Sequence, residues 1–186
     1  MNLNFTGRDR DHRAIDLCHA VTIFGMALSA KPKDILELGV GTGLVTDALL
    51  SAIEYNQQGH LTCMDSWLDY GGKEPDFWEG FRNRGALLAV NQELAYLKAT
   101  PDNTFDFLMS DADHGGTWPQ EHFRVTRPGS ICFFHDTNSP HEYPGLNAIV
   151  DLVRTLGWHY HHFTGNSRED ESCHRGLLMV VNGKKA

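Results

Sequence analysis

A glycine-rich segment carries the most specific chemistry in this sequence. Residues 37–43 read Glu-Leu-Gly-Val-Gly-Thr-Gly, between an apolar run and a segment with apolar residues at helical spacing. A glycine turn from a strand into a helix lets the backbone approach a ligand closely, while helix N–H groups point at it. Leu44 or Thr46 occupies the third glycine position of the dinucleotide fingerprint G-x-G-x-x-G, which disfavours a nucleotide-dependent oxidoreductase. A turn that serves only a tight strand-to-helix connection remains the alternative.

Polar side chains end three further apolar runs. In an open α/β sheet, ligands bind outside the carboxyl ends of the strands, so residues at these ends should converge with the glycine turn. They are Asp65 after residues 61–64, Asp111 to His114 after residues 105–109, and His135 with Asp136 after residues 131–134.

The elements that must position these residues alternate along the chain. Apolar residues at helical spacing predict an amphipathic helix over about residues 11–29, which Lys31-Pro32-Lys33 ends. Strands are expected at 34–38, 61–64, 86–90, 105–109, 131–134, 158–163 and 177–181, helices at 44–52, 77–88, 92–98 and 146–153, and loops at 70–75, 115–119 and 138–145. The last two strands have no helix between them and should pair antiparallel. This order predicts an α/β, Rossmann-like, doubly wound and mostly parallel sheet of about seven strands with a final antiparallel strand.

Length and composition exclude several classes of function. The 186 residues predict one domain (1–186), with an N-terminal helical segment (1–30) and a core (33–182). Sixteen basic and 24 acidic side chains give a net charge of −8, which argues against binding to nucleic acid or anionic lipid. The four cysteines form no C-x-x-C pair, and the N-terminal region has the wrong charges for a secretory signal. We therefore expect a cytoplasmic protein with buried thiols.

The glycine segment resembles motif I of the class I S-adenosylmethionine-dependent methyltransferases. Asp65, 22 residues after Gly43, matches the carboxylate that holds the ribose of the methyl donor in that superfamily. The resemblance covers about residues 33–182 and implies the class I methyltransferase fold. The donor-binding residues that it implies are Glu37, Gly39, Val40, Gly41, Thr42, Gly43, Asp65, Ser66, Trp67 and Asp111.

The later polar runs narrow the resemblance. Asp111-Ala-Asp-His114, Arg127-Pro-Gly129 and His135-Asp136 are most similar to metal-assisted O-methyltransferases, in particular the small bacterial branch called methyltransferase family 24. The resemblance implies Asp111, His135 and Asp136 as metal ligands and His114 as the catalytic base. His135 replaces the usual aspartate and Mg²⁺ prefers oxygen, so a softer ion such as Mn²⁺ or Zn²⁺, or no metal, stays open as an alternative.

Each of these residues has a simpler interpretation. Asp65 could cap a loop, and Asp111 could accept hydrogen bonds from backbone amides or from the donor's amino group. His114 and His135 could each donate to a carbonyl.

Aromatic and histidine residues elsewhere leave similar choices open. Trp67, Trp78 and Trp118 should rim the site, where they could stack on adenine or on a planar acceptor, although packing is the commoner role. Residues 159, 161 and 162 are histidines that cannot all join one tight site in a regular strand, because adjacent residues point to opposite faces.

The resemblance predicts a methyltransferase that modifies a hydroxyl of a small molecule with S-adenosylmethionine, assisted by a divalent metal. Two alternatives stay open: a metal-independent methyltransferase, and a noncatalytic domain that binds the donor. The expected partner is a small-molecule acceptor, not nucleic acid or a membrane. About 30 residues precede the first expected strand and give little cover over the site, so a second copy of the chain could supply it.

Overall fold

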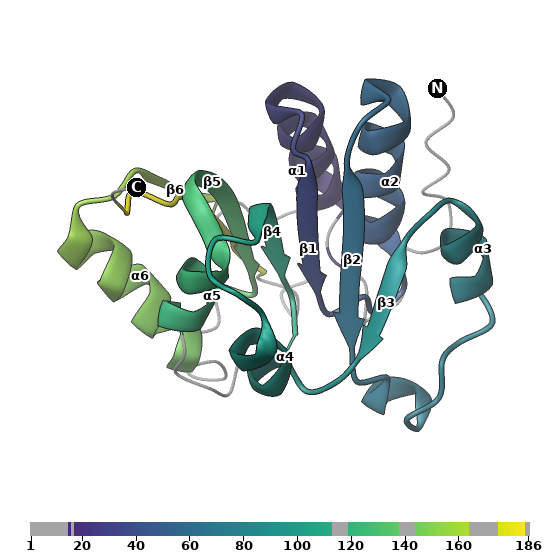
Figure 1. Ribbon diagram of the computed structural model, residues 1–186. Coiled ribbons are helices and arrows are strands. Elements are labelled where there is room, and N and C mark those ends of the chain that lie inside the picture. The colour runs from purple at the N-terminus through teal and green to yellow at the C-terminus, as the bar shows by residue number, and fades with distance from the viewer. Residues whose placement is uncertain (1–14, 16, 113–118, 138–143, 164–174, 185–186) are drawn as a thin grey trace.

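A seven-stranded sheet with helices on both faces forms the centre of the molecule (Figure 1). The computed structural model describes residues 15, 17–112, 119–137, 144–163 and 175–184. The strands are β1 (Asp34–Leu38), β2 (His60–Asp65), β3 (Leu87–Val90), β4 (Phe105–Ser110), β5 (Thr126–His135), β6 (Tyr160–Phe163) and β7 (Leu177–Val181). The helices are α1 (Leu17–Ala30), α2 (Leu44–Asn56), α3 (Trp78–Asn83), α4 (Glu93–Ala99), α5 (Pro119–Val125) and α6 (Pro144–Leu156), with a short 3₁₀ helix η1 (Leu68–Tyr70).

The strand order is β3-β2-β1-β4-β5-β7-β6, and β7 alone runs antiparallel to its two neighbours. The connections reverse direction between β1 and β4, because β1 leads outward to β2 and β3 while β4 leads outward to β5. This reversal places the carboxyl ends of β1 and β4 at the point where doubly wound sheets bind ligands. The predicted fold class and the antiparallel pairing of the last two strands are confirmed.

The helices form a layer on each face of the sheet (Figure 1). Helices α1, α2 and α3 contribute to one buried apolar cluster, and α4, α5 and α6 contribute to the other. The two clusters lie on opposite faces of the sheet. In β1, Ile35 and Glu37 face the cluster of α1, α2 and α3, whereas Leu36 and Leu38 face the cluster of α4, α5 and α6. A strand buried on both faces is rich in apolar residues, and Ile35, Leu36 and Leu38 made residues 34–38 recognisable in the sequence.

Three expected elements differ from those observed. The helix expected at 77–88 ends at Asn83, because Gly85 has a left-handed φ of 93° and the chain then enters β3. Pro119, assigned to a loop, is the first residue of α5; proline is favoured at this position because its missing N–H has no helical partner. β5 begins at Thr126, so Arg127-Pro-Gly129 lies inside the strand, where the pairing with β4 is irregular.

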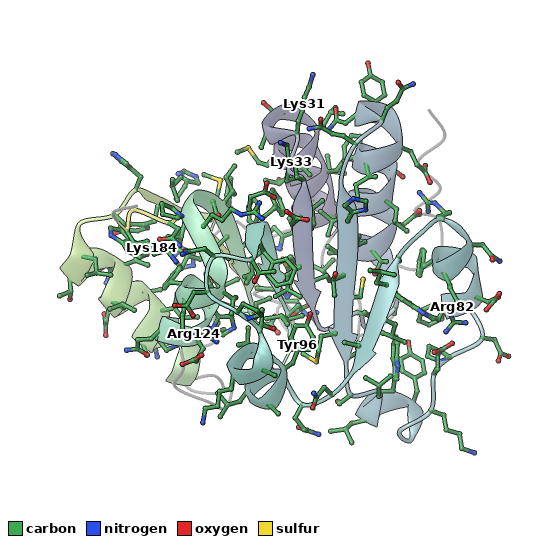
Figure 2. All side chains as sticks on the ribbon, viewed as in Figure 1. Lys31, Lys33, Arg82, Tyr96, Arg124 and Lys184 are labelled. Atoms are coloured by element: carbon green, nitrogen blue, oxygen red, sulfur yellow. The ribbon has the colours of Figure 1, made fainter. Side chains whose placement is uncertain are left out.

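The labelled basic side chains are spread over the molecule (Figure 2). Lys31 and Lys33 lie near the amino edge of the sheet, Arg82 lies on α3, and Arg124 and Lys184 lie together near α5. The Lys184 ammonium donates to the Phe123 carbonyl at 2.9 Å. Among the described helices, none combines the length and the apolar character that crossing a bilayer requires.

A cavity of about 530 Å³ opens at the end of the sheet where the parallel strands begin, between α4 and the first residues of those strands. Asp34, His60 and Tyr96 contribute to its lining. It lies at the opposite edge from the glycine turn and the strand-end carboxylates, which identify the functional edge by their chemistry.

Candidate functional site

The glycine turn links β1 to α2 through left-handed backbone. Gly39, Gly41 and Gly43 have φ angles of 82°, 53° and 79°. A Cβ on Gly39 would lie 2.2 Å from the Asp111 carbonyl oxygen, and a Cβ on Gly43 would lie 2.3 Å from the Phe81 ring. Glycine is therefore required at both positions by the chain's own packing. The contact with Asp111 also places the turn directly beside the end of β4.

Asp65, the last residue of β2, holds the glycine turn through its carboxylate. One oxygen accepts hydrogen bonds from the backbone N–H groups of Val40, at 2.7 Å, and Gly41, at 3.4 Å. The other accepts from the Trp67 N–H at 2.6 Å. A carboxylate has about four acceptor positions. The side chain is only partly buried, so these contacts do not enclose the carboxylate completely.

Glu37 lies beneath the glycine turn and is fully buried, with an exposed fraction of 0%. Its Oε2 accepts hydrogen bonds from the Thr46 hydroxyl at 2.8 Å and from the Cys63 thiol at 3.1 Å. Burial raises the pKa of Glu37 to about 8, although these two hydrogen bonds oppose the shift. The same burial, together with Glu37, raises the pKa of Cys63. The carboxyl group is therefore mainly protonated at neutral pH and supports the turn from below.

Glu37→Gln should remove a pH dependence of stability. A buried acid with a raised pKa stabilises the folded state while protonated, and this contribution is lost as pH rises from 4.5 towards 8. The wild type should therefore lose up to about 1.4 kcal/mol per pH unit across that window relative to the variant. Urea unfolding at pH 5 and pH 9 measures it. Glu54→Gln, which removes a surface partner of Arg84, is the control. If the free energy of unfolding changed with pH equally in the wild type and Glu37→Gln, the raised pKa of Glu37 would be contradicted.

Two of the predicted rim tryptophans pack in an aromatic cluster beside the glycine turn. Trp67 and Trp78 have exposed fractions of 1% and 0%, and their rings lie 5.9 Å apart. Tyr70, Phe77 and Phe81 complete the cluster. The packing interpretation therefore describes both indoles, while Trp118 lies outside the described residues. Ser66, next to Asp65, is partly exposed, and Thr42 is buried in the turn.

Tyr70 makes a contact that the sequence did not single out. Its hydroxyl donates to the Gly41 carbonyl at 2.9 Å, so η1 is tied to the glycine turn. The sequence signal that could have indicated this contact was a tyrosine a few residues after Asp65.

The strand-end residues Asp111, His135 and Asp136 form a second group. Their ligand atoms all lie within 4.8 Å of one another. The Nδ1 of His135 is 3.0 Å from an Asp111 oxygen and 3.2 Å from an Asp136 oxygen. Burial lowers the pKa of His135, but the two carboxylates raise it by more, so the net shift is upward. We call these three residues the strand-end cluster; His114 and Asp113 lie outside the described part of the chain.

The donor atoms of the strand-end cluster fit a divalent cation. Two carboxylates and one imidazole nitrogen converge from the ends of β4 and β5. The other ring nitrogen of His135, Nε2, is buried and has no hydrogen-bond partner among the described residues. A mixed nitrogen and oxygen set suits Mn²⁺ or Zn²⁺ better than Mg²⁺.

Two neighbours of the strand-end cluster come from elements that the sequence did not connect with it. His19 on α1 is buried, and its ring meets the edge of the His135 ring at a centroid distance of 5.4 Å. The Arg175 Nε is 3.8 Å from an Asp136 oxygen. A histidine on the apolar face of a helix was the only signal for the first contact.

The three C-terminal histidines do not share one site. The His161 ring makes an edge-to-face contact with Phe163 at a centroid distance of 4.3 Å, whereas the His162 Nε2 is 2.8 Å from the Thr137 hydroxyl. The expected alternation of His161 and His162 across the strand is confirmed by their register partners, Met179 and Leu178, which belong to opposite layers.

Comparison with known proteins adds a family and several structural neighbours. The family model of a methyltransferase domain matches residues 36–137. A candidate O-methyltransferase from Klebsiella pneumoniae superposes with a TM-score of 0.74 at 15% identity, covering 95% of this chain and 85% of that one. An O-methyltransferase from Bacillus cereus in complex with SAH gives 0.70 at 15%, covering 92% and 84%. The O-methyltransferase TomG from Streptomyces achromogenes in complex with SAM gives 0.61 at 17%, covering 94% and 84%. No curated protein matches the sequence.

Proposed function

The chain belongs to the methyltransferase domain family, and on that premise we propose that it transfers a methyl group from S-adenosylmethionine to a hydroxyl of a small molecule. The observation that carries the proposal is the contact between Gly39 and the Asp111 backbone. It brings the glycine turn, which suits the donor, against the strand-end cluster, which suits the acceptor. Structural neighbours with SAM or SAH bound support the choice of donor.

The residues of the turn bind and orient the donor in this proposal. Asp65 keeps the turn in place through Val40 and offers its exposed side to the ribose hydroxyls. The sulfonium already activates the methyl group, so the protein mainly aligns the sulfur, the methyl carbon and the acceptor oxygen. The acceptor hydroxyl must also lose its proton, and His114 is the proposed base.

We also propose that Asp111, His135 and Asp136 hold a divalent cation. A bound cation lowers the pKa of a hydroxyl and orients an acceptor that carries two neighbouring oxygens. Asp111 and Asp136 supply the negative charge, while His135 supplies the nitrogen that favours Mn²⁺ or Zn²⁺. The nearby guanidinium of Arg175 favours the second candidate, a metal-independent methyltransferase, because it already places positive charge beside Asp136.

A titration followed by an assay tests the proposal in two steps. Isothermal titration with SAH should give saturable binding; absence of heat would exclude the methyltransferase function. With catechol as acceptor and labelled S-adenosylmethionine, methylation should fall about 100-fold in EDTA and return with Mn²⁺. A rate that EDTA leaves unchanged would select the metal-independent enzyme.

The proposed setting is the cytoplasm, with a small-molecule acceptor and without nucleic acid or membrane as partner. The free thiols of Cys63 and Cys132 are buried, as expected, whereas Cys18 is exposed, contrary to the expectation. Free thiols suit a reducing compartment. The net charge of −8 supports a small acceptor over nucleic acid or anionic lipid.

A further inference from the structure

The backbone at Asp136 has an unusual conformation. Its φ angle is 57°, in the left-handed region, although the residue follows the buried strand residue His135 and precedes the buried Thr137. Left-handed backbone costs a residue with a Cβ about 1–2 kcal/mol, somewhat less for aspartate. Neighbouring contacts must therefore hold the chain in this conformation, which sets the direction of the Asp136 carboxylate.

Besides the direct contacts of Asp136 with His135 and Arg175, the C-terminal hairpin formed by β6 and β7 holds the residue that follows it. The Thr137 N–H donates to the Gly176 carbonyl at 3.3 Å, and the Thr137 hydroxyl is 2.8 Å from the His162 Nε2. Gly176 immediately precedes β7, which pairs with β5 up to His135 opposite Leu177. The hairpin thus fixes the residue that follows Asp136 at two points.

His162 is placed for this role, and its neighbour in β6 is not. His162 is half-buried on the face of the hairpin that includes Leu178, whereas His161 is exposed and contacts the Phe163 ring on the other face. His161 therefore provides a matched control from the same strand.

We infer that His162 is a positioning residue: its hydrogen bond to Thr137 fixes the Asp136 carboxylate within the strand-end cluster. The inference rests on the proposed function in that it treats this cluster as the metal site. Polar groups that orient metal ligands commonly change metal affinity by about 10–100-fold when they are removed. The same geometry can be examined without a metal, because Asp136 also contacts the His135 Nδ1 at 3.2 Å.

Mn²⁺ titration of four variants, followed by the electron paramagnetic resonance of the free ion, tests the inference. His162→Leu should weaken Mn²⁺ binding by about tenfold. His162→Gln, whose amide can still reach the Thr137 hydroxyl, should recover most of the affinity, and His161→Ala should bind like the wild type. Thr137→Val should repeat the loss if His162→Leu fails to fold. SAH affinity should stay unchanged in all four, since none of them touches the glycine turn.

The crystal structure of His162→Leu separates this inference from the proposed function. If the wild type binds no Mn²⁺, the metal site fails, and the position of Asp136 in the variant decides the inference alone. A carboxylate displaced from His135 supports it. An Asp136 that keeps its left-handed φ and its contact with His135 overturns it, as does wild-type Mn²⁺ affinity in both His162→Leu and Thr137→Val.

Discussion

Asp65→Ala should weaken SAH binding by about 100-fold. The carboxylate offers a charged hydrogen-bond acceptor to the ribose and also holds the glycine turn through Val40 and Trp67. Hydrogen bonds to charged groups contribute about 1.5–3 kcal/mol each, and about 2.8 kcal/mol corresponds to a factor of 100 in affinity. Isothermal titration with SAH measures the loss, which should exceed that of Asp65→Asn because the amide keeps one acceptor oxygen.

The control is a carboxylate with similar bonds at the other edge of the sheet. Asp106 accepts hydrogen bonds from the N–H groups of Lys33 and Asp34, at 2.9–3.1 Å. Asp106→Ala should therefore reduce stability while it leaves SAH affinity unchanged. Equal SAH affinity in Asp65→Ala and the wild type would remove Asp65 from the donor site.

Asp111→Asn should lower methyl transfer by more than about 100-fold at saturating donor. The amide keeps the shape of the side chain but loses the charge that faces the His135 Nδ1 and that the proposed cation would require. Single-turnover transfer to catechol in excess Mn²⁺ measures the rate, and a parallel Mn²⁺ titration should show weaker binding. Asp151→Asn, an exposed carboxylate on α6, should match the wild type in both measurements.

The same variant distinguishes two roles of Asp111. If it holds the cation, Asp111→Asn should bind SAH like the wild type. Loss of SAH affinity with unchanged Mn²⁺ binding would instead show that Asp111 contacts the donor's amino group and is not a metal ligand.

Much of the fold was predictable because the strands carry strong signals. The central strands are buried on both faces and mostly apolar, although Glu37 interrupts β1 and Asp106 interrupts β4. Each ends at or directly before a glycine or an acidic residue. The end of α3 was placed wrongly, and α5 was not expected at all, for a local reason. Gly85 and Pro119 indicate that regular structure is interrupted, but they do not say whether a helix ends there or begins.

The residues of the candidate site that lie at strand ends were predictable from the sequence. The residues that contact them from other helices and strands were not. Asp111, His135 and Asp136 follow strands whose order a doubly wound sheet fixes, so their convergence followed from topology. The contacts of His19 and His162 depend on how α1 and the β6–β7 hairpin pack, and no short-range pattern encodes such packing. Burial of Glu37 likewise depends on α2 covering β1.

The close approach of Gly39 to the Asp111 carbonyl couples two ligand-binding segments mechanically. A displacement of the loop after β1 would press directly on the backbone of Asp111, the residue proposed to hold the cation, because no side chain lies between them. Thermodynamic reciprocity then applies: whatever free energy one ligand's arrival contributes to the other's affinity is returned equally in the opposite order of addition.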